Sequence, residues 1–135
     1  MPVFDKHFTL AEARAALPAL RRRLLRVQEM LAEVRRSQGD GDGVQVVVLR
    51  GNGKGPILSG DGGHKEERKR EAQRLIEGIA EEGIQIKDLE RGLVDFPHFL
   101  GGDPAHEVYL CWHLGEDTIA YWHEIEAGYG GRTPL

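Results

Sequence analysis

The sequence lacks the features that mark secreted and membrane proteins. A single cysteine among 135 residues excludes an internal disulfide and a zinc cage made only of thiolates. No apolar run is long enough for a signal peptide or a membrane span. Positive charge is not in excess, because 18 Lys and Arg stand against 22 Asp and Glu and give a net charge of −4. We therefore expect a cytoplasmic protein without a membrane partner, and the charge argues against nucleic acid as its partner.

Residues 9–37 carry the pattern of a long helix. Thr9 and Glu12 fit a capping box, in which each side chain accepts a hydrogen bond from a backbone N–H at the helix start. Apolar side chains then recur at alternating spacings of three and four, as in a heptad seam. Pro18 lies inside this pattern without changing its phase, which predicts a kinked but continuous helix.

A second, more polar helix is expected over residues 64–82, ended by Gly83. The two helices predict an antiparallel hairpin in which the first offers more apolar length than the second covers. The apolar surface of the first helix that the second helix leaves uncovered must pack against a sheet or another copy of the chain. We therefore expect a homo-oligomer whose interface is the seam of the first helix, formed by Leu17, Leu20, Leu24, Val27, Leu31 and Val34.

The segment between the helices, residues 39–63, is rich in glycine. "VQVVVL" favours a strand and "PIL" could return beside it, so the segment is either a β-hairpin or an inserted loop. Lys54 in "GNGKG" could meet an anion. The glycine and hydroxyl positions of a phosphate-binding P-loop are missing, however, and an ordinary hairpin turn is favoured.

After Gly83 the apolar residues alternate with a period of two, which is typical of strands. "EVYLCWHL" and "TIAYWHEI" predict two strands joined by the turn "GEDT". The length suits a single domain over residues 1–135. The predicted fold class is α+β: an antiparallel helical hairpin with a long first helix, packed with a three- to four-stranded antiparallel sheet over residues 84–126.

The last hairpin suggests a metal site, if its turn places Leu114 opposite Ile119. Alternation then puts Cys111, His113 and Glu124 on one face, with the S, N and O donors that zinc accepts. Further carboxylates near this face are Asp95 and Glu126. Neither a CxxC nor an HExxH spacing is present, so a face with incidental polar residues is favoured over a metal site. If the face is a metal site, zinc is the cofactor that its donor types suit.

Two basic features have simpler explanations beside functional ones. Arg132 in "AGYGGR" could bind an anion in a backbone nest, or could belong to a turn-rich tail. "RRRLLR" (21–26) could bind RNA, but its arginines flank an apolar seam, where they are expected to lie over the partner surface.

Three stretches resemble a known family: "FTLAEARAALPALRRRL", "DLERGLVDFP" and "VYLCWHLGEDTIAYWHEIEAGYGGRTPL". It is a family of small uncharacterised bacterial proteins, catalogued as a domain of unknown function. The resemblance spans most of the chain apart from residues 39–63, and it implies a helical hairpin joined to a small antiparallel sheet. It implies no activity and therefore no catalytic residues.

Three functions follow as hypotheses. The preferred one is a non-enzymatic, self-associating interaction module. The alternative is a small metal-binding protein or metal-dependent enzyme that uses the face of Cys111, His113 and Glu124. The third is an RNA- or ribosome-associated factor that uses the helical arginines.

Overall fold

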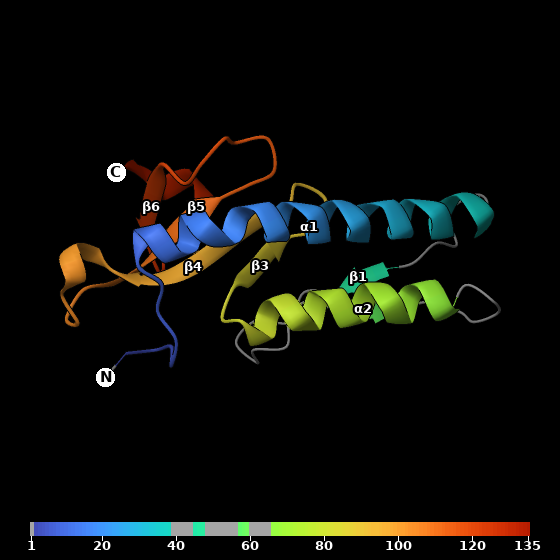
Figure 1. The fold of residues 1–135 in the computed structure, drawn as a ribbon, viewed down its shortest axis with the longest axis horizontal. Helices are drawn as coiled ribbons and strands as arrows, with labels where there is room; N and C mark the ends of the chain where they lie inside the picture. The colour runs from blue at the N-terminus through green and yellow to red at the C-terminus, as the bar shows by residue number, and fades with distance from the viewer. Residues whose placement is uncertain (1, 39–44, 48–56, 60–65) are drawn as a thin grey trace.

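The computed structural model describes residues 2–38, 45–47, 57–59 and 66–135. It has two α-helices, a two-stranded sheet and a five-stranded sheet among these residues (Figure 1). The helices and strands are, in chain order, α1 (Leu10–Gln38), β1 (Gln45–Val47), β2 (Ile57–Ser59), α2 (Glu66–Glu81), β3 (Gln85–Asp88), β4 (Leu93–Phe99), β5 (Glu107–Trp112), β6 (Tyr121–Glu124) and β7 (Thr133–Pro134). Single 3-10 turns occupy Leu100–Gly102 and Tyr129–Gly131.

The start of α1 has the predicted capping box. The Thr9 N–H donates to Glu12 Oε1 at 2.9 Å, and the Glu12 N–H donates to Thr9 Oγ1 at 3.0 Å. The helix continues through Pro18, which is exposed. The carbonyl that loses its helical hydrogen bond there therefore lies on the solvent side, where water can satisfy it.

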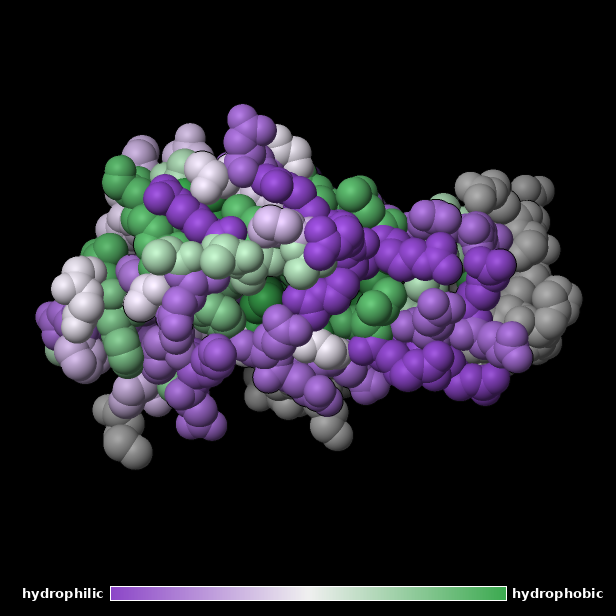
Figure 2. Space-filling model, viewed as in Figure 1, coloured by the Kyte–Doolittle hydropathy of each residue, from purple (hydrophilic) through white to green (hydrophobic). Residues whose placement is uncertain are grey.

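The seam of α1 is filled by the chain's own core. The first half of α1 lies over the five-stranded sheet and the second half lies beside α2 (Figure 1). The predicted interface residues are at most 4% exposed in this single chain: Leu17, Leu20, Leu24, Val27, Leu31 and Val34. The seam therefore cannot also serve as a homo-oligomer interface, because α2 and the sheet already occupy it. In the view of Figure 2, hydrophilic residues predominate over α2 and the second half of α1, whereas weakly hydrophobic residues also show along the first half of α1.

The larger sheet confirms the α+β class and has more strands than predicted. Its order is β3-β4-β5-β6-β7, with every neighbouring pair antiparallel. The extra strand comes from the tail, where Trp122 pairs with Thr133. The smaller sheet pairs β1 with β2, in the segment predicted to be a hairpin or a loop.

The two faces of the five-stranded sheet have different partners. Val94, Phe96, Leu110 and Trp112 are fully buried and belong to the core that α1 and α2 share. Because side chains alternate along a strand, the residues between them, Asp95 and Cys111 among them, point to the face away from α1.

The register of β5 and β6 differs from the predicted one. Cys111 pairs with Tyr121 and Tyr109 pairs with His123. The prediction that Leu114 opposes Ile119 is therefore wrong by one residue, since extending the observed pairing would place Leu114 opposite Thr118. A shift of one residue moves every side chain of β6 to the other face relative to β5.

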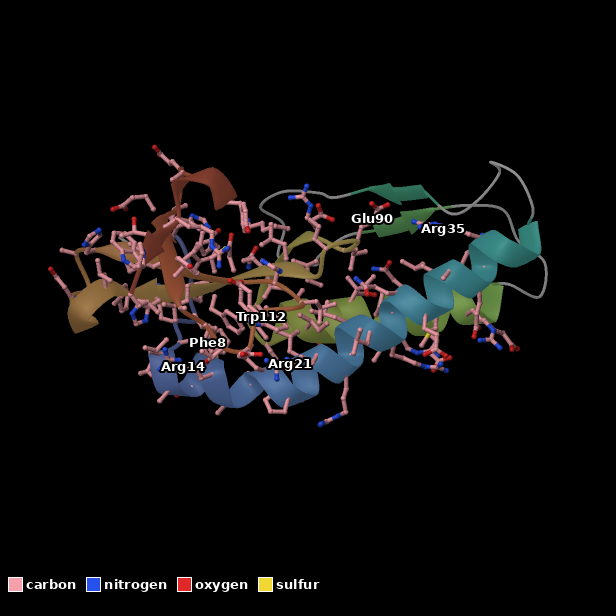
Figure 3. The ribbon with its side chains drawn as sticks, turned by 90° about the horizontal axis from the view of Figure 1, so that it is seen from above. Phe8, Arg14, Arg21, Arg35, Glu90 and Trp112 are labelled. Atoms are coloured by element: carbon pink, nitrogen blue, oxygen red, sulfur yellow. The ribbon has the colours of Figure 1, made fainter. Side chains whose placement is uncertain are left out.

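The loop 113–120 between these strands is held by contacts that no local pattern reveals. The Arg14 guanidinium donates to the Ile119 carbonyl at 2.8 Å, and Arg21 donates to the Asp117 carbonyl at 2.6 Å. Both arginines lie on α1, along the part of the helix beside Trp112 (Figure 3). The arginines of this helix therefore fix the loop onto the rest of the chain.

Gly92, in the turn between β3 and β4, is a site where a side chain cannot fit. Its φ is +65°, and an added Cβ would lie 2.5 Å from Leu114 Cδ1. We expect Gly92→Ala to lower the free energy of unfolding by about 2–4 kcal/mol, through left-handed backbone strain and the clash. Gly115→Ala is the matched control, because Gly115 has a φ of +104° and no atom within 4 Å of the added Cβ. Urea denaturation of both variants measures the difference, and equal losses would contradict the close approach.

Candidate metal centre

Three neighbouring strands bring Asp95, Cys111 and His123 together. Asp95 of β4 pairs directly with Cys111 of β5, and His123 of β6 pairs with Tyr109, two residues from Cys111. All three side chains therefore project from the face away from α1. One potential ligand atom from each lies within 4.8 Å of the other two. The three residues are 3%, 1% and 2% exposed, respectively.

The hydrogen bonds of His123 orient its ring toward Asp95. Nδ1 lies 2.7 Å from the Glu124 carbonyl oxygen, and Nε2 lies 3.0 Å from Asp95 Oδ1. Because a carbonyl oxygen can only accept, Nδ1 carries a proton and donates it there. Nε2 is then the nitrogen available to a proton shared with Asp95 or to a metal ion. Histidines that bind metals usually have this arrangement, with the second ring nitrogen donating to a carbonyl or carboxylate.

The acid–base state of the centre follows from its burial. Burial raises the pKa of the Cys111 thiol to about 12, and the Asp95 charge adds to this shift. Without a metal, Cys111 is therefore a protonated thiol at neutral pH, which does not suit a nucleophilic cysteine. Burial alone would lower the pKa of His123, but the hydrogen bond and charge of Asp95 outweigh it and raise that pKa above its ordinary value.

Two tyrosines flank the centre on the same face. The Tyr109 ring stands edge-on to the His123 ring, with centroids 5.4 Å apart. Burial raises the pKa of Tyr109 to about 12, so that the phenol is neutral. On the other side, Tyr121 pairs with Cys111, and the Arg132 guanidinium stacks 4.1 Å above the Tyr121 ring.

The sequence prediction identified only part of this group. Cys111 and Asp95 are in it, but His113 and Glu124 are not. His113 lies beyond the end of β5 with Nδ1 2.7 Å from the Leu114 carbonyl oxygen, and Glu124 pairs with His106 at 2.9 Å. Glu124 also pairs with Val108, so it points to the face opposite Cys111.

Glu126, the remaining candidate, is exposed in the turn after β6. The sequence prediction did not include His123 among the candidate ligands. A signal for the buried group was nonetheless present. Asp95 interrupts the apolar run "LVDF", and a carboxylate buried in a central strand requires a partner.

The two anion-site candidates have different outcomes. Lys54 lies outside the residues that the structure describes. Arg132 donates to both carboxylate oxygens of Glu116, at 2.9 and 2.7 Å, and its guanidinium lies 4.6 Å from the Tyr129 ring. In this structure Arg132 thus fastens the tail to the loop 113–120.

Comparison with known proteins places this architecture in a family. Residues 6–135 match the model of a family described as an uncharacterized conserved protein, DUF2203. The chain belongs to the DUF2203 family. This confirms the resemblance to a domain of unknown function, and the match includes all three residues of the candidate centre. No curated protein and no solved structure matches this DUF2203 chain. Across the residues that the structure describes, no helix has both the length and the apolar character needed to cross a membrane.

Proposed function

We propose that this DUF2203 protein binds a transition-metal ion, zinc in the first place, through Asp95, Cys111 and His123. The observation that carries the proposal is the convergence of one sulfur, one nitrogen and one oxygen donor from three adjacent strands. These are the donor types that zinc accepts in proteins. All three are buried, so their proximity is fixed by strand pairing rather than by mobile surface side chains.

The spacing of the donors supports a tetrahedral ion. Zinc binds nitrogen and oxygen at about 2.0–2.2 Å and sulfur at about 2.3 Å, which places neighbouring ligands about 3.5 Å apart. The donors lie within 4.8 Å of one another, and the shortest distance, between His123 Nε2 and Asp95 Oδ1, is 3.0 Å. Small side-chain adjustments therefore bring them to coordination distance.

The charge balance also favours a dication. A metal ion would replace the thiol proton of Cys111 and the Nε2 proton of His123. The thiolate and the Asp95 carboxylate then balance a 2+ charge, so that the buried centre is neutral with the ion bound. Neutrality matters because an uncompensated charge is costly in a dry interior.

The burial of the donors favours a structural role for the ion. The three residues leave one position of a tetrahedron to water or another small ligand. A substrate would have to reach side chains that are no more than 3% exposed. We therefore propose an ion that joins β4, β5 and β6, as structural zinc sites do, in preference to a metal-dependent enzyme. The self-associating module lacks comparable support, because the seam on which it depended is buried within the chain.

Metal titration of the protein purified without an affinity tag tests this function. We expect one equivalent of Zn²⁺ to bind and to raise the melting temperature, because an ion that binds only the folded state stabilises it. Co²⁺ is the spectroscopic probe, and we expect thiolate-to-cobalt charge-transfer absorption that disappears in Cys111→Ser. The absence of bound Zn²⁺ and of this absorption would rule out the centre.

The affinity for zinc should rise with pH. Binding displaces protons from Cys111, whose pKa is about 12, and from His123, whose pKa is raised. Each displaced proton strengthens binding by up to about tenfold per pH unit below the pKa of its group. We expect the dissociation constant to fall about 10- to 100-fold from pH 6 to pH 7, measured by competition with a chelator of known affinity at each pH. A constant affinity would contradict ligation by these two groups.

The folding stability of the metal-free protein should fall as the pH rises, whereas the zinc affinity rises. Because the folded pKa of His123 lies above its ordinary value of 6.5, its pairing with Asp95 stabilises the fold fully below that value. This stabilisation is lost as the pH rises through the folded pKa. Thermal melts with and without zinc from pH 6 to pH 8 therefore separate the pH dependence of zinc binding from that of the His123–Asp95 pairing.

A further inference from the structure

We propose that residues 2–8 form a strap that shields the Asp95–Cys111–His123 centre and must lift before an ion or a reagent can reach it. The inference rests on the proposed metal-binding function for its biological purpose. Its structural basis is separate: the centre is almost completely buried although it lies on the sheet face away from α1. Groups on that face that adjoin the centre include Tyr109, which the strap contacts, and Tyr121, over which Arg132 stacks.

Glu107 anchors the strap on this face. Glu107 lies on β5 at a position that alternation places on the same face as Tyr109 and Cys111. Its Oε1 accepts the Val3 N–H at 2.7 Å, and its Oε2 accepts the Phe4 N–H at 3.1 Å. His7 Nε2 lies 2.6 Å from the same carboxylate. One carboxylate thus binds three points of the strap, and hydrogen bonds to a charged acceptor are stronger than neutral ones.

The strap crosses the sheet at the end of β4 where, among the described residues, β5 pairs with one side of β4 and no strand pairs with the other. β3 pairs with β4 only as far as Asp95. Beyond that point the Phe8 N–H donates to the Pro97 carbonyl at 2.7 Å, and His98 Nδ1 lies 2.7 Å from the Phe8 carbonyl oxygen. The strap therefore occupies the free edge of β4, and Figure 1 shows this N-terminal segment passing β4 before α1 begins.

The aromatic side chains of the strap divide between the two faces. Phe8 packs edge-on against Phe96 in the core that α1 covers, with ring centroids 5.2 Å apart. His7 stacks on Phe99 at 3.8 Å, and Phe4 lies against Tyr109 with centroids 5.5 Å apart. Phe8 therefore fixes the end of the strap next to α1, whereas the Phe4 end depends on Glu107 and Tyr109.

Tyr109 connects the strap to the centre. Its phenol ring contacts the Phe4 ring and also the ring of His123. Lys87 Nζ also lies 4.9 Å from the Tyr109 centroid, so the ring is enclosed on several sides. When the Phe4 end of the strap lifts, Tyr109 loses one of these contacts and can turn away from His123. Access to the centre is therefore coupled to the strap through one aromatic side chain.

Labelling of the single cysteine tests the strap in the full chain. In metal-free protein, the probe is the rate at which Cys111 reacts with a water-soluble disulfide reagent under native conditions. We expect Phe4→Ala and Glu107→Gln to increase this rate about tenfold or more, because each removes a contact that holds the strap closed. In zinc-loaded protein, the same variants should release the ion to a competing chelator faster by a similar factor.

Two control variants make the test specific. Val3→Ala keeps the backbone N–H that Glu107 accepts and alters only a side chain that is 71% exposed, so we expect wild-type rates. Ile79→Val destabilises the helical core without touching the strap, and it should leave the rate unchanged well below the melting temperature. A rate increase in Ile79→Val equal to that of the strap variants, or no increase in the strap variants, would overturn the inference.

The two readouts keep this inference distinct from the proposed function. If the protein binds no zinc while Cys111 labelling accelerates in the strap variants, the strap stands and the metal function fails. If zinc binds while neither labelling nor release changes, the metal function stands and the strap fails.

Discussion

Replacing Leu24 with aspartate should unfold the chain at 25 °C. Leu24 is fully buried in the core that α1, α2 and the sheet share. Removing a buried leucine side chain alone costs about 2–5 kcal/mol, and burying an unpaired carboxylate adds several more. The total is comparable with the 5–15 kcal/mol by which a typical domain is stable. Loss of the far-UV helical signal and of the cooperative thermal transition measures this outcome.

The neighbouring residue provides a matched control. Leu25 is 54% exposed, so Leu25→Asp should change stability by less than about 1 kcal/mol and leave the fold intact.

The Leu24 and Leu25 variants together also distinguish a seam that packs within its own chain from a seam that joins two copies. A seam that joined two copies of the chain would let Leu24→Asp dissociate an oligomer while the sheet stayed folded. A folded, monomeric Leu24→Asp protein would therefore contradict the intrachain core.

The second large effect should be a loss of zinc affinity of more than about 100-fold in each of Asp95→Asn, Cys111→Ser and His123→Gln. Loss of a group that only orients a ligand costs about 10- to 100-fold, so loss of a ligand should cost more. These substitutions nearly preserve side-chain size. They therefore limit the destabilisation that larger truncations would cause in a site that is 3% exposed or less.

A histidine and a carboxylate outside the centre, His113 and Glu124, provide control variants for the three proposed ligands. His113 and Glu124 have their own partners in the Leu114 carbonyl and His106. We expect His113→Gln and Glu124→Gln to retain zinc affinity within about threefold, since neither side chain lies among the buried donors. Isothermal titration of all five variants, with circular dichroism to verify folding, gives the comparison. Greater losses in these two variants than in Asp95→Asn and His123→Gln would favour the group predicted from the sequence.

The helical part of the fold could be predicted because its signals are local. The capping box of Thr9 and Glu12 acts over three residues, and Gly83, with a φ of +93°, ends the second helical segment from within its own turn. The heptad seam identified the buried side of α1 correctly. It did not identify what covers that side, because an apolar stripe packs equally well on a helix, a sheet or a second chain.

The candidate centre shows where local patterns no longer suffice. Alternation placed Cys111 on one face of β5 without error, but the partner on β6 depended on the register. That register depends on the loop 113–120, whose carbonyls are bound by Arg14 and Arg21 about 95 to 105 residues earlier in the chain. The one-residue difference exchanged Glu124 for His123 beside Cys111.

The sequence by itself determined the two helices and their ends, the α+β class, the alternation along the strands and the membership of Cys111 and Asp95 in a group of potential ligands. Hydrogen bonds and apolar spacings within a few residues decide such features. Only the tertiary structure decided that α1 faces its own chain, that the tail adds a fifth strand, and that His123 completes the buried group. Strand register and the partner of an apolar face depend on contacts between distant segments, and these exist only once the chain has folded.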